Sequence, residues 1–176
     1  MTTLRHEIRI EAPVDAVWRA IGEDLTAVQH YNRMVSAAQL LSDQREGVGA
    51  SRRCELKPKG FVEERVWEWT PKRAIGLEVA ASEWPIAFMK WRTQLAEDGK
   101  ATLVSQEMNY KVKFGPLGAL MDALMMRRKL DSGIRDVFLD LKRGWHLNLL
   151  ADQPIFDAVA ARQRRHRRVG NGAVRR

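Results

Sequence analysis

The chain has 176 residues, of which 45% are hydrophobic, and its formal net charge is +8. This length suits one domain with a hydrophobic core and is short for two. The single cysteine, Cys54, excludes an internal disulfide framework and a thiolate metal cluster, so nothing indicates an oxidising compartment. Residues 1–20 are too rich in charge for a secretory signal, and no stretch has the ~20 apolar residues of a membrane span. A soluble, cytoplasmic protein is therefore expected.

The first part of the chain predicts a strand followed by two short helices. Apolar residues alternate with charged ones from Leu4 onward, which is typical of an opening strand. Pro13 suits the first turn of a helix, and apolar residues at helical spacing extend that helix to Gly22. A second short helix comes next, for which Asp24 or Thr26 supplies the N-cap. The two helices are expected over residues 13–22 and 24–30.

The middle of the chain predicts an antiparallel meander. Turn signals such as Pro58-Lys59-Gly60 and Asp98-Gly99 separate segments of strand character. No helical pattern of useful length interrupts these segments, which argues against parallel βαβ units. The strands are expected over residues 34–41, 50–57, 61–70, 74–82, 87–97 and 101–113. With the opening strand they form a sheet of six to seven strands, so the fold class is α+β.

One long amphipathic helix comes after the last strand, beginning just after Gly118. Its apolar residues form two stripes that are centred about 100° apart, more than the drift of a straight helix. A kink or short break is therefore predicted at residues 129–133, where Gly133 weakens helical continuity, and the helix should run to about Leu150. Methionine adapts to irregular apolar shapes, so a methionine cluster in the first half could face a ligand cavity or simply fill the core. That cluster is Met121, Met125 and Met126.

The positive charge is concentrated at the C-terminus. From Arg162 onward there are seven arginines and no acidic residue, which leaves a net charge of +1 on residues 1–161. Because this segment has no apolar periodicity, residues 151–176 are expected to form a basic, disordered tail behind a domain of residues 1–150. The tail could bind nucleic acid or an anionic membrane electrostatically, or it could be solvated without a dedicated partner.

Several segments resemble the START-like (SRPBCC) superfamily, and in particular its polyketide cyclase/dehydrase and lipid-transport type, which is related to the plant Bet v 1 allergens. Their order and spacing, rather than a single motif, carry the resemblance over residues 3–149. The segments are Ile10–Trp18, Gly47–Leu56, Val62–Val66, Gly115–Gly118 and Leu141-Lys142. The resemblance implies a helix-grip fold, in which a curved antiparallel sheet wraps around the long C-terminal helix and encloses a large apolar cavity. Arg33 departs from the pattern, because members commonly have proline there, so the nearby pocket rim is expected to differ.

The resemblance also suggests which residues line the cavity. Alternation along residues 61–69 places Glu64 on one face of its strand without deciding which face is inward, and the resemblance favours inward. Arg53 is its predicted partner, because either charge left unpaired in an apolar cavity would cost several kcal/mol; a solvated cross-strand pair is the commoner alternative. Tyr110 would line the cavity from the last strand. The further candidate ligand contacts are Glu55, Val62, Val66, Trp91, Met108, Met121, Met125 and Phe138.

Two functions from different classes remain open at this point. The protein could hold a hydrophobic small molecule, lipid-like or aromatic and polyketide-like, as a carrier or sensor. Alternatively, it could be a cyclase or dehydratase in which Glu64 moves protons, Arg53 stabilises an enolate oxygen and Tyr110 donates to a carbonyl. The four histidines are scattered, so no metal or cofactor is expected, and Cys54 in mid-strand is expected to be inert.

Overall fold

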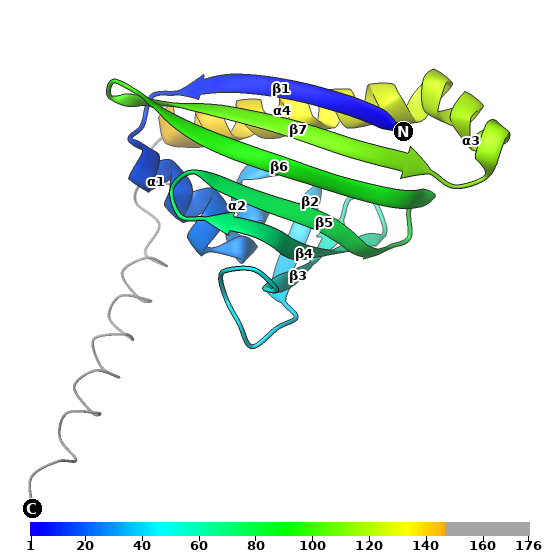
Figure 1. The fold of residues 1–176 in the computed structure, drawn as a ribbon, viewed down its shortest axis with the longest axis horizontal. Coiled ribbons are helices and arrows are strands. Elements are labelled where there is room, and N and C mark those ends of the chain that lie inside the picture. The colour runs from blue at the N-terminus through cyan, green and yellow to red at the C-terminus, as the bar shows by residue number, and fades with distance from the viewer. Residues whose placement is uncertain (147–176) are drawn as a thin grey trace, which may run out of the picture.

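The computed structural model describes residues 1–146, in which seven antiparallel strands form one curved sheet with a long helix across it (Figure 1). The strand order is β1-β7-β6-β5-β4-β3-β2. Each strand from β2 to β7 therefore pairs with its sequence neighbour, β1 pairs with β7, and β1 and β2 are the two edge strands. The strands are β1 (Thr2–Ile10), β2 (Val35–Leu40), β3 (Ser51–Leu56), β4 (Phe61–Thr70), β5 (Ala74–Ser82), β6 (Ile86–Asp98) and β7 (Ala101–Val112). The predicted basic tail, residues 151–176, lies outside the described residues.

The two short helices predicted after the first strand are present, and both are irregular. Helix α1 (Val14–Trp18) continues into the π-helical turn η1 (Arg19–Glu23), while the 3-10 turn η2 (Leu25–Ala27) leads into α2 (Val28–Tyr31). Asp24 is the N-cap, because its Oδ1 accepts a hydrogen bond from the Thr26 backbone N–H at 2.8 Å. Together these elements close one end of the concave face of the sheet (Figure 1).

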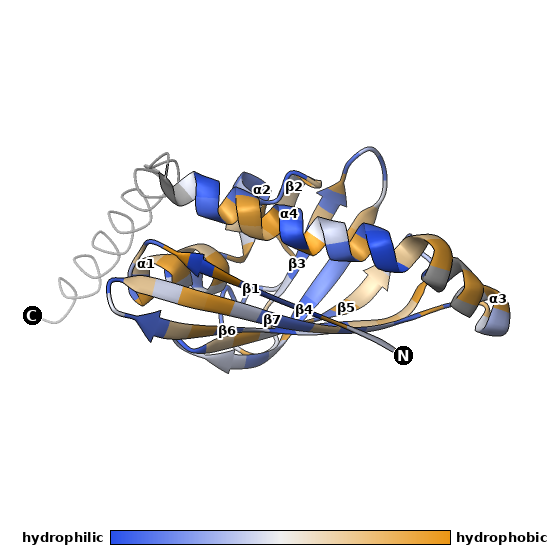
Figure 2. Ribbon diagram, turned by 90° about the horizontal axis from the view of Figure 1, so that it is seen from above, coloured by the Kyte–Doolittle hydropathy of each residue, from blue (hydrophilic) through white to orange (hydrophobic). Residues whose placement is uncertain are grey.

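The C-terminal helix consists of α3 (Gly115–Met121), the π-helical turn η3 (Asp122–Met126) and α4 (Arg127–His146). Figure 2 shows α4 lying across the concave face of the sheet, with α3 bent away at one end. The predicted break at residues 129–133 is therefore wrong, because α4 passes through Gly133 without interruption. A π-helical turn inserts one extra residue and so rotates the rest of the helix by about 100°, which accounts for the offset between the two apolar stripes.

The buried apolar side chains form two clusters between the sheet and the helices. The first surrounds Trp18, whose indole meets that of Trp69 edge-on at a centroid distance of 5.0 Å. The second surrounds Tyr110 and Met108 on β7. Helix α4 contributes to both: Phe138 and Leu141 pack in the first cluster, and Leu130 and Ile134 in the second. The predicted α+β helix-grip architecture is thus confirmed, with a sheet that stays open. None of the helices within residues 1–146 has the length and apolar character needed to span a bilayer.

Candidate functional site

A buried ion pair joins β3 and β4 on the concave face of the sheet. Arg52 and Glu64 lie directly opposite each other in the strand register, and Arg52 Nε donates to Glu64 Oε2 at 2.6 Å. Arg52 Nη1 also donates to the backbone carbonyl of Leu25, at 2.6 Å. The two charged residues are only 4% and 8% exposed. The guanidinium therefore connects two strands to the short helical segment that covers them.

The predicted pairing of Glu64 with Arg53 is wrong, because adjacent residues of a strand point to opposite faces. Arg53 lies on the outer face, where its Nε donates to Glu55 Oε1 at 2.7 Å and its Nη1 to Glu63 Oε1 at 3.0 Å. Its guanidinium also lies 3.6 Å from the centroid of the Phe61 ring. Arg53 and Glu55 consequently do not line the interior, and the solvated cross-strand alternative describes Arg53.

Burial around the ion pair keeps the protons of the neighbouring Cys54 and Tyr31 side chains in place. Burial opposes the charge on Arg52, yet the pKa of Arg52 is raised, because the attraction of the Glu64 carboxylate is joined by smaller contributions from Cys54, from Tyr31 and from the hydrogen bond to Glu64. Burial, assisted by Glu64, raises the pKa of the Cys54 thiol to about 12, and burial likewise raises the pKa of Tyr31 to about 12. The thiolate is the reactive form of cysteine, so Cys54 is set up as an inert core residue.

This arrangement predicts that stability declines in alkali. In the unfolded chain the Cys54 thiol ionises near its ordinary pKa of 9.0, whereas the folded protein holds the proton until about pH 12. Between these values only the unfolded state loses the proton, so each pH unit should lower the free energy of unfolding by up to about 1.4 kcal/mol. Urea unfolding at several pH values should show a shallower decline for Cys54→Ala than for the wild type. Parallel declines would contradict the assignment.

A second buried contact fixes the π-helical turn to the sheet. Tyr110 is fully buried, and its hydroxyl donates to Asp122 Oδ1 at 2.5 Å, while Thr2 Oγ1 donates to Asp122 Oδ2 at 2.7 Å. Burial and then the Asp122 carboxylate raise the pKa of Tyr110. The Tyr110 hydroxyl, which was predicted to donate a hydrogen bond to a ligand carbonyl, therefore donates to Asp122 instead. Tyr110 is also three strands away from Glu64, about 14 Å across the sheet.

Three polar residues form a row across the concave face, between the two apolar clusters. His6 pairs with Gln106, which pairs with Thr93 on its other side, and Thr93 Oγ1 donates to Gln106 Oε1 at 3.2 Å. His6 Nε2 is buried and lies 3.0 Å from Asp131 Oδ1 on α4, a contact that lacks hydrogen-bond geometry, and the nitrogen has no hydrogen-bond partner among the described residues. We call His6, Gln106 and Thr93 the polar row.

The polar row was missed from the sequence although a signal existed. His6 shares its strand face with Leu4 and Ile8, which pack in the second and the first apolar cluster respectively. Period-two alternation therefore places the imidazole inward, between two apolar neighbours. The alternation along β1, rather than the spacing of the histidines, is therefore the sequence signal for an inward His6.

The other predicted ligand contacts have different positions, and their role remains a prediction. Met125 is 46% exposed, and Met126 instead packs in the second cluster, so the predicted inward position of Met125 is wrong because the extra residue of η3 shifts the helix phase. The side chain of Met121 lies outside the described residues. Val66, Met108 and Phe138 are buried, while Val62 and Trp91 are half-buried against the apolar clusters.

Arg33, the departure from the family pattern, binds the end of α2 to the long helix. Its Nε donates to Asp140 Oδ2 at 2.6 Å, and this hydrogen bond holds the pKa of Asp140 below its ordinary value. The side chains are 49% and 19% exposed, so the contact lies at the rim rather than inside the fold. Arginine at this position thus ties the end of α2 to α4.

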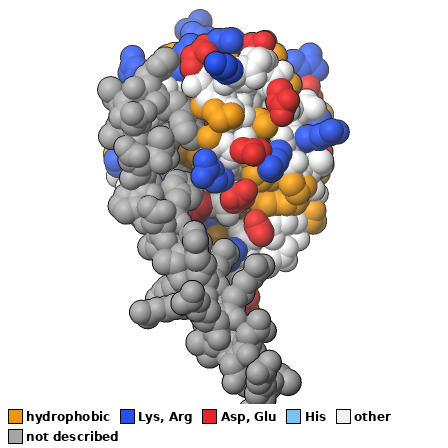
Figure 3. All heavy atoms as spheres, turned by 90° about the vertical axis from the view of Figure 1, so that its left-hand side faces the viewer, with side chains coloured by type: hydrophobic (Ala, Val, Ile, Leu, Met, Phe, Trp, Pro, Cys, Tyr) orange, Lys and Arg blue, Asp and Glu red, His pale blue; other side chains and the backbone are white. Residues whose placement is uncertain are grey.

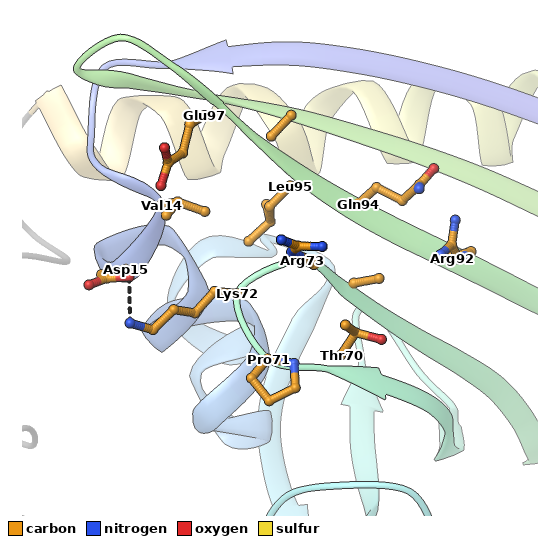
Figure 4. Close-up of a pocket in the computed structure, with 12 residues that line it drawn as sticks. Val14, Asp15, Thr70, Pro71, Lys72, Arg73, Arg92, Gln94, Leu95 and Glu97 are labelled. Carbon is orange, nitrogen blue, oxygen red and sulfur yellow. Dashed lines mark ion pairs between the residues drawn. The ribbon is translucent and has the colours of Figure 1, made fainter.

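An open pocket of about 960 Å³ lies outside the concave face, where the start of α1 meets the β4–β5 turn and the end of β6. Figure 4 shows Lys72 reaching from the turn to Asp15, with which it forms an ion pair of 2.9 Å. Its lining is largely polar and charged, unlike the enclosed apolar cavity that the resemblance implies. Among residues 1–146, no three His, Cys, Asp or Glu side chains are grouped so as to hold a metal ion.

The sheet, the helix across it and the polar groups between them define a protein of the helix-grip class. The sequence matches the family described as "Polyketide cyclase / dehydrase and lipid transport" over residues 1–144, and the chain therefore belongs to this family. The family description covers both enzymes and transport proteins. No curated protein sequence matches the chain significantly.

Solved structures share the fold at low sequence identity. The di-domain ARO/CYC protein BexL of the BE-7585A biosynthetic pathway is 17% identical with a TM-score of 0.70, covering 87% of this chain and 48% of BexL. XoxI from Bacillus cereus is 15% identical with a TM-score of 0.66, covering 82% and 95% of the two chains. Major latex-like protein 151 from Panax ginseng is 12% identical with a TM-score of 0.63, covering 81% and 95%. These similarities establish a common fold.

Proposed function

We propose that this protein binds a hydrophobic small molecule between the concave face of the sheet and α4, as a carrier or sensor. The ligand's apolar parts would contact the two apolar clusters, and one polar group would meet the polar row. The observation that carries the proposal is the buried His6 Nε2, which lies 3.0 Å from the Asp131 carboxylate on α4 and makes no hydrogen bond with the described residues. A buried polar atom without a hydrogen bond costs about 1–3 kcal/mol, and a hydrogen bond to a ligand carbonyl, hydroxyl or carboxylate would offset part of that cost.

The cyclase or dehydratase alternative has less support, because its three predicted residues do not converge. Arg53 is on the outer face, and the Tyr110 hydroxyl donates its hydrogen bond to Asp122. The Glu64 carboxylate accepts a hydrogen bond from Arg52, which also donates to a backbone carbonyl. General acid and base chemistry needs its groups within hydrogen-bond reach of one reacting centre.

The proposal is tested by comparing two fluorescent probes and a matched pair of variants. Cis-parinaric acid carries a carboxylate on an apolar chain, whereas N-phenyl-1-naphthylamine has no such group. His6→Leu and Gln106→Leu should weaken cis-parinaric acid binding about 5- to 10-fold, the effect of losing one hydrogen bond, and leave the naphthylamine nearly unchanged. Gln94→Leu is the control, because Gln94 is exposed on the opposite face of β6.

Fluorescence titration provides the dissociation constants. If neither probe binds the wild type, or if Gln94→Leu weakens cis-parinaric acid as much as Gln106→Leu does, the proposed position of the ligand is wrong. Equal weakening of both probes by His6→Leu would mean that the row supports the fold rather than the ligand's polar group.

A further inference from the structure

Exposed apolar side chains are concentrated at the end of the molecule formed by α3 and η3. Five large ones within twelve residues are between 46% and 66% exposed, and we call them the α3 surface: Phe114, Leu117, Leu120, Leu124 and Met125. The other exposed large apolar residues among the described ones are spread singly along the chain. A cluster of this kind, rather than single exposed residues, marks an interaction surface.

The backbone explains why these side chains are not packed against the sheet. Phe114 and Gly115 have φ angles of +75° and +52°, which turn the chain sharply from β7 into α3. Gly118 forms the inner side of α3: a Cβ there would lie 1.8 Å from the Lys113 carbonyl oxygen. The large residues consequently lie on the other sides of the helix. Figures 1 and 2 show α3 projecting beyond the end of the sheet, away from the other described elements.

Basic side chains flank the α3 surface on both sides. All five are exposed, and none forms an ion pair with another described residue: Lys111, Lys113, Arg127, Arg128 and Lys129. Asp122 is the one acidic residue within 111–130, and it is buried against Tyr110 and Thr2. The opposite end of the molecule differs, because acidic and basic side chains are interspersed there (Figure 3).

We propose that the α3 surface docks the protein on an anionic lipid bilayer. The apolar side chains would enter the boundary between headgroups and acyl chains, and the five cations would contact the anionic headgroups. An apolar helix face flanked by lysine and arginine is the composition of an interfacial helix, and each cation near such a membrane contributes about 1 kcal/mol. A protein partner would need acidic groups placed opposite both flanks, whereas an anionic bilayer presents them everywhere. This inference is independent of the proposed ligand.

Vesicle co-sedimentation of the full chain tests the proposal. The vesicles are phosphatidylcholine alone or phosphatidylcholine with roughly 30% phosphatidylglycerol. Leu117→Glu/Leu124→Glu should lower the partition coefficient on anionic vesicles at least tenfold. Leu41→Glu/Leu139→Glu is the control, because it makes the same change in net charge at two other exposed leucines. This control should change the partition coefficient less than threefold.

Further measurements separate the alternatives. Arg128→Gln/Lys129→Gln should weaken binding to anionic vesicles and leave binding to phosphatidylcholine unchanged; equal binding of the wild type to both vesicles would overturn the anionic specificity. Circular dichroism confirms folding of each variant. If the leucine variant binds as tightly as its control, the α3 surface is not the docking site. If sedimentation without lipid shows a dimer that only the α3 variant abolishes, the occupant is a second copy of the chain and the membrane proposal fails.

Discussion

Replacing Arg52 by alanine should lower the free energy of unfolding by about 3–5 kcal/mol, because the buried Glu64 carboxylate would lose its partner. The carbonyl of Leu25 would also lose its donor. Glu64→Ala should have an effect of similar size, since it leaves the guanidinium uncompensated instead. Urea-induced unfolding of each variant measures the change, with the two-state behaviour checked by two spectroscopic probes.

Arg53→Ala is the matched control for this experiment. Arg53 is the next residue of the same strand and contacts two carboxylates, yet its side chain is 27% exposed and its partners Glu55 and Glu63 are 48% and 29% exposed. Solvated pairs of this kind contribute about 0–1 kcal/mol. Equal losses for Arg52→Ala and Arg53→Ala would refute the distinction between the buried and the outer arginine.

Replacing glycine by alanine should have opposite signs at two helical positions. In η1, a Cβ at Gly22 would lie 2.6 Å from Cε2 of the Trp18 indole, which is 2% exposed and packed edge-on against Trp69. The ring has no free space to move into, so Gly22→Ala should lower the free energy of unfolding by about 1–3 kcal/mol. Thermal and urea unfolding would measure this change.

Gly133→Ala is the counterpart in α4. Apart from the neighbouring residues and backbone of α4 itself, no described atom lies within 4 Å of a Cβ placed at Gly133, and the position is inside a regular helix. Alanine there should raise the free energy of unfolding by up to about 1 kcal/mol, because glycine loses more conformational entropy on folding. A destabilising Gly133→Ala would mean that this glycine has a role in α4 beyond a tolerated helical position.

The predicted turn alone does not give the position of the buried ion pair. A hairpin centred on residues 58–60, that is on Lys59, would pair Arg52 with Val66, whereas the register that forms is centred on Pro58 and pairs Arg52 with Glu64. This observed register also pairs Arg53 with Glu63, which is the arrangement on the outer face. Alternation within a single strand gives no information on the register between two strands, and for that reason the predicted partner of Glu64 was Arg53 instead of Arg52. A shift of one residue in strand register exchanges the two faces.

The long helix shows a different limit. Its two apolar stripes and their offset of about 100° were readable from the sequence. The cause was not, because an interrupted helix and a π-helical turn give the same offset. The turn at Asp122–Met126 is held by a contact of the Asp122 carboxylate with Tyr110 and Thr2, of which Thr2 is 120 residues away in sequence. Only a tertiary contact therefore distinguishes the two explanations.

The sequence by itself determined the order of the elements and the antiparallel meander, because periodicity and turn residues act over a few neighbouring positions. It also carried the family resemblance, which implied the helix-grip class and which the match over residues 1–144 confirms. The tertiary structure decided which charges meet in the interior, which helix residues are exposed on α3, and that His6 lies between two apolar clusters without a hydrogen-bond partner among the described residues. These properties depend on strand register and helix phase, and in both cases a shift of one residue exchanges buried and exposed positions.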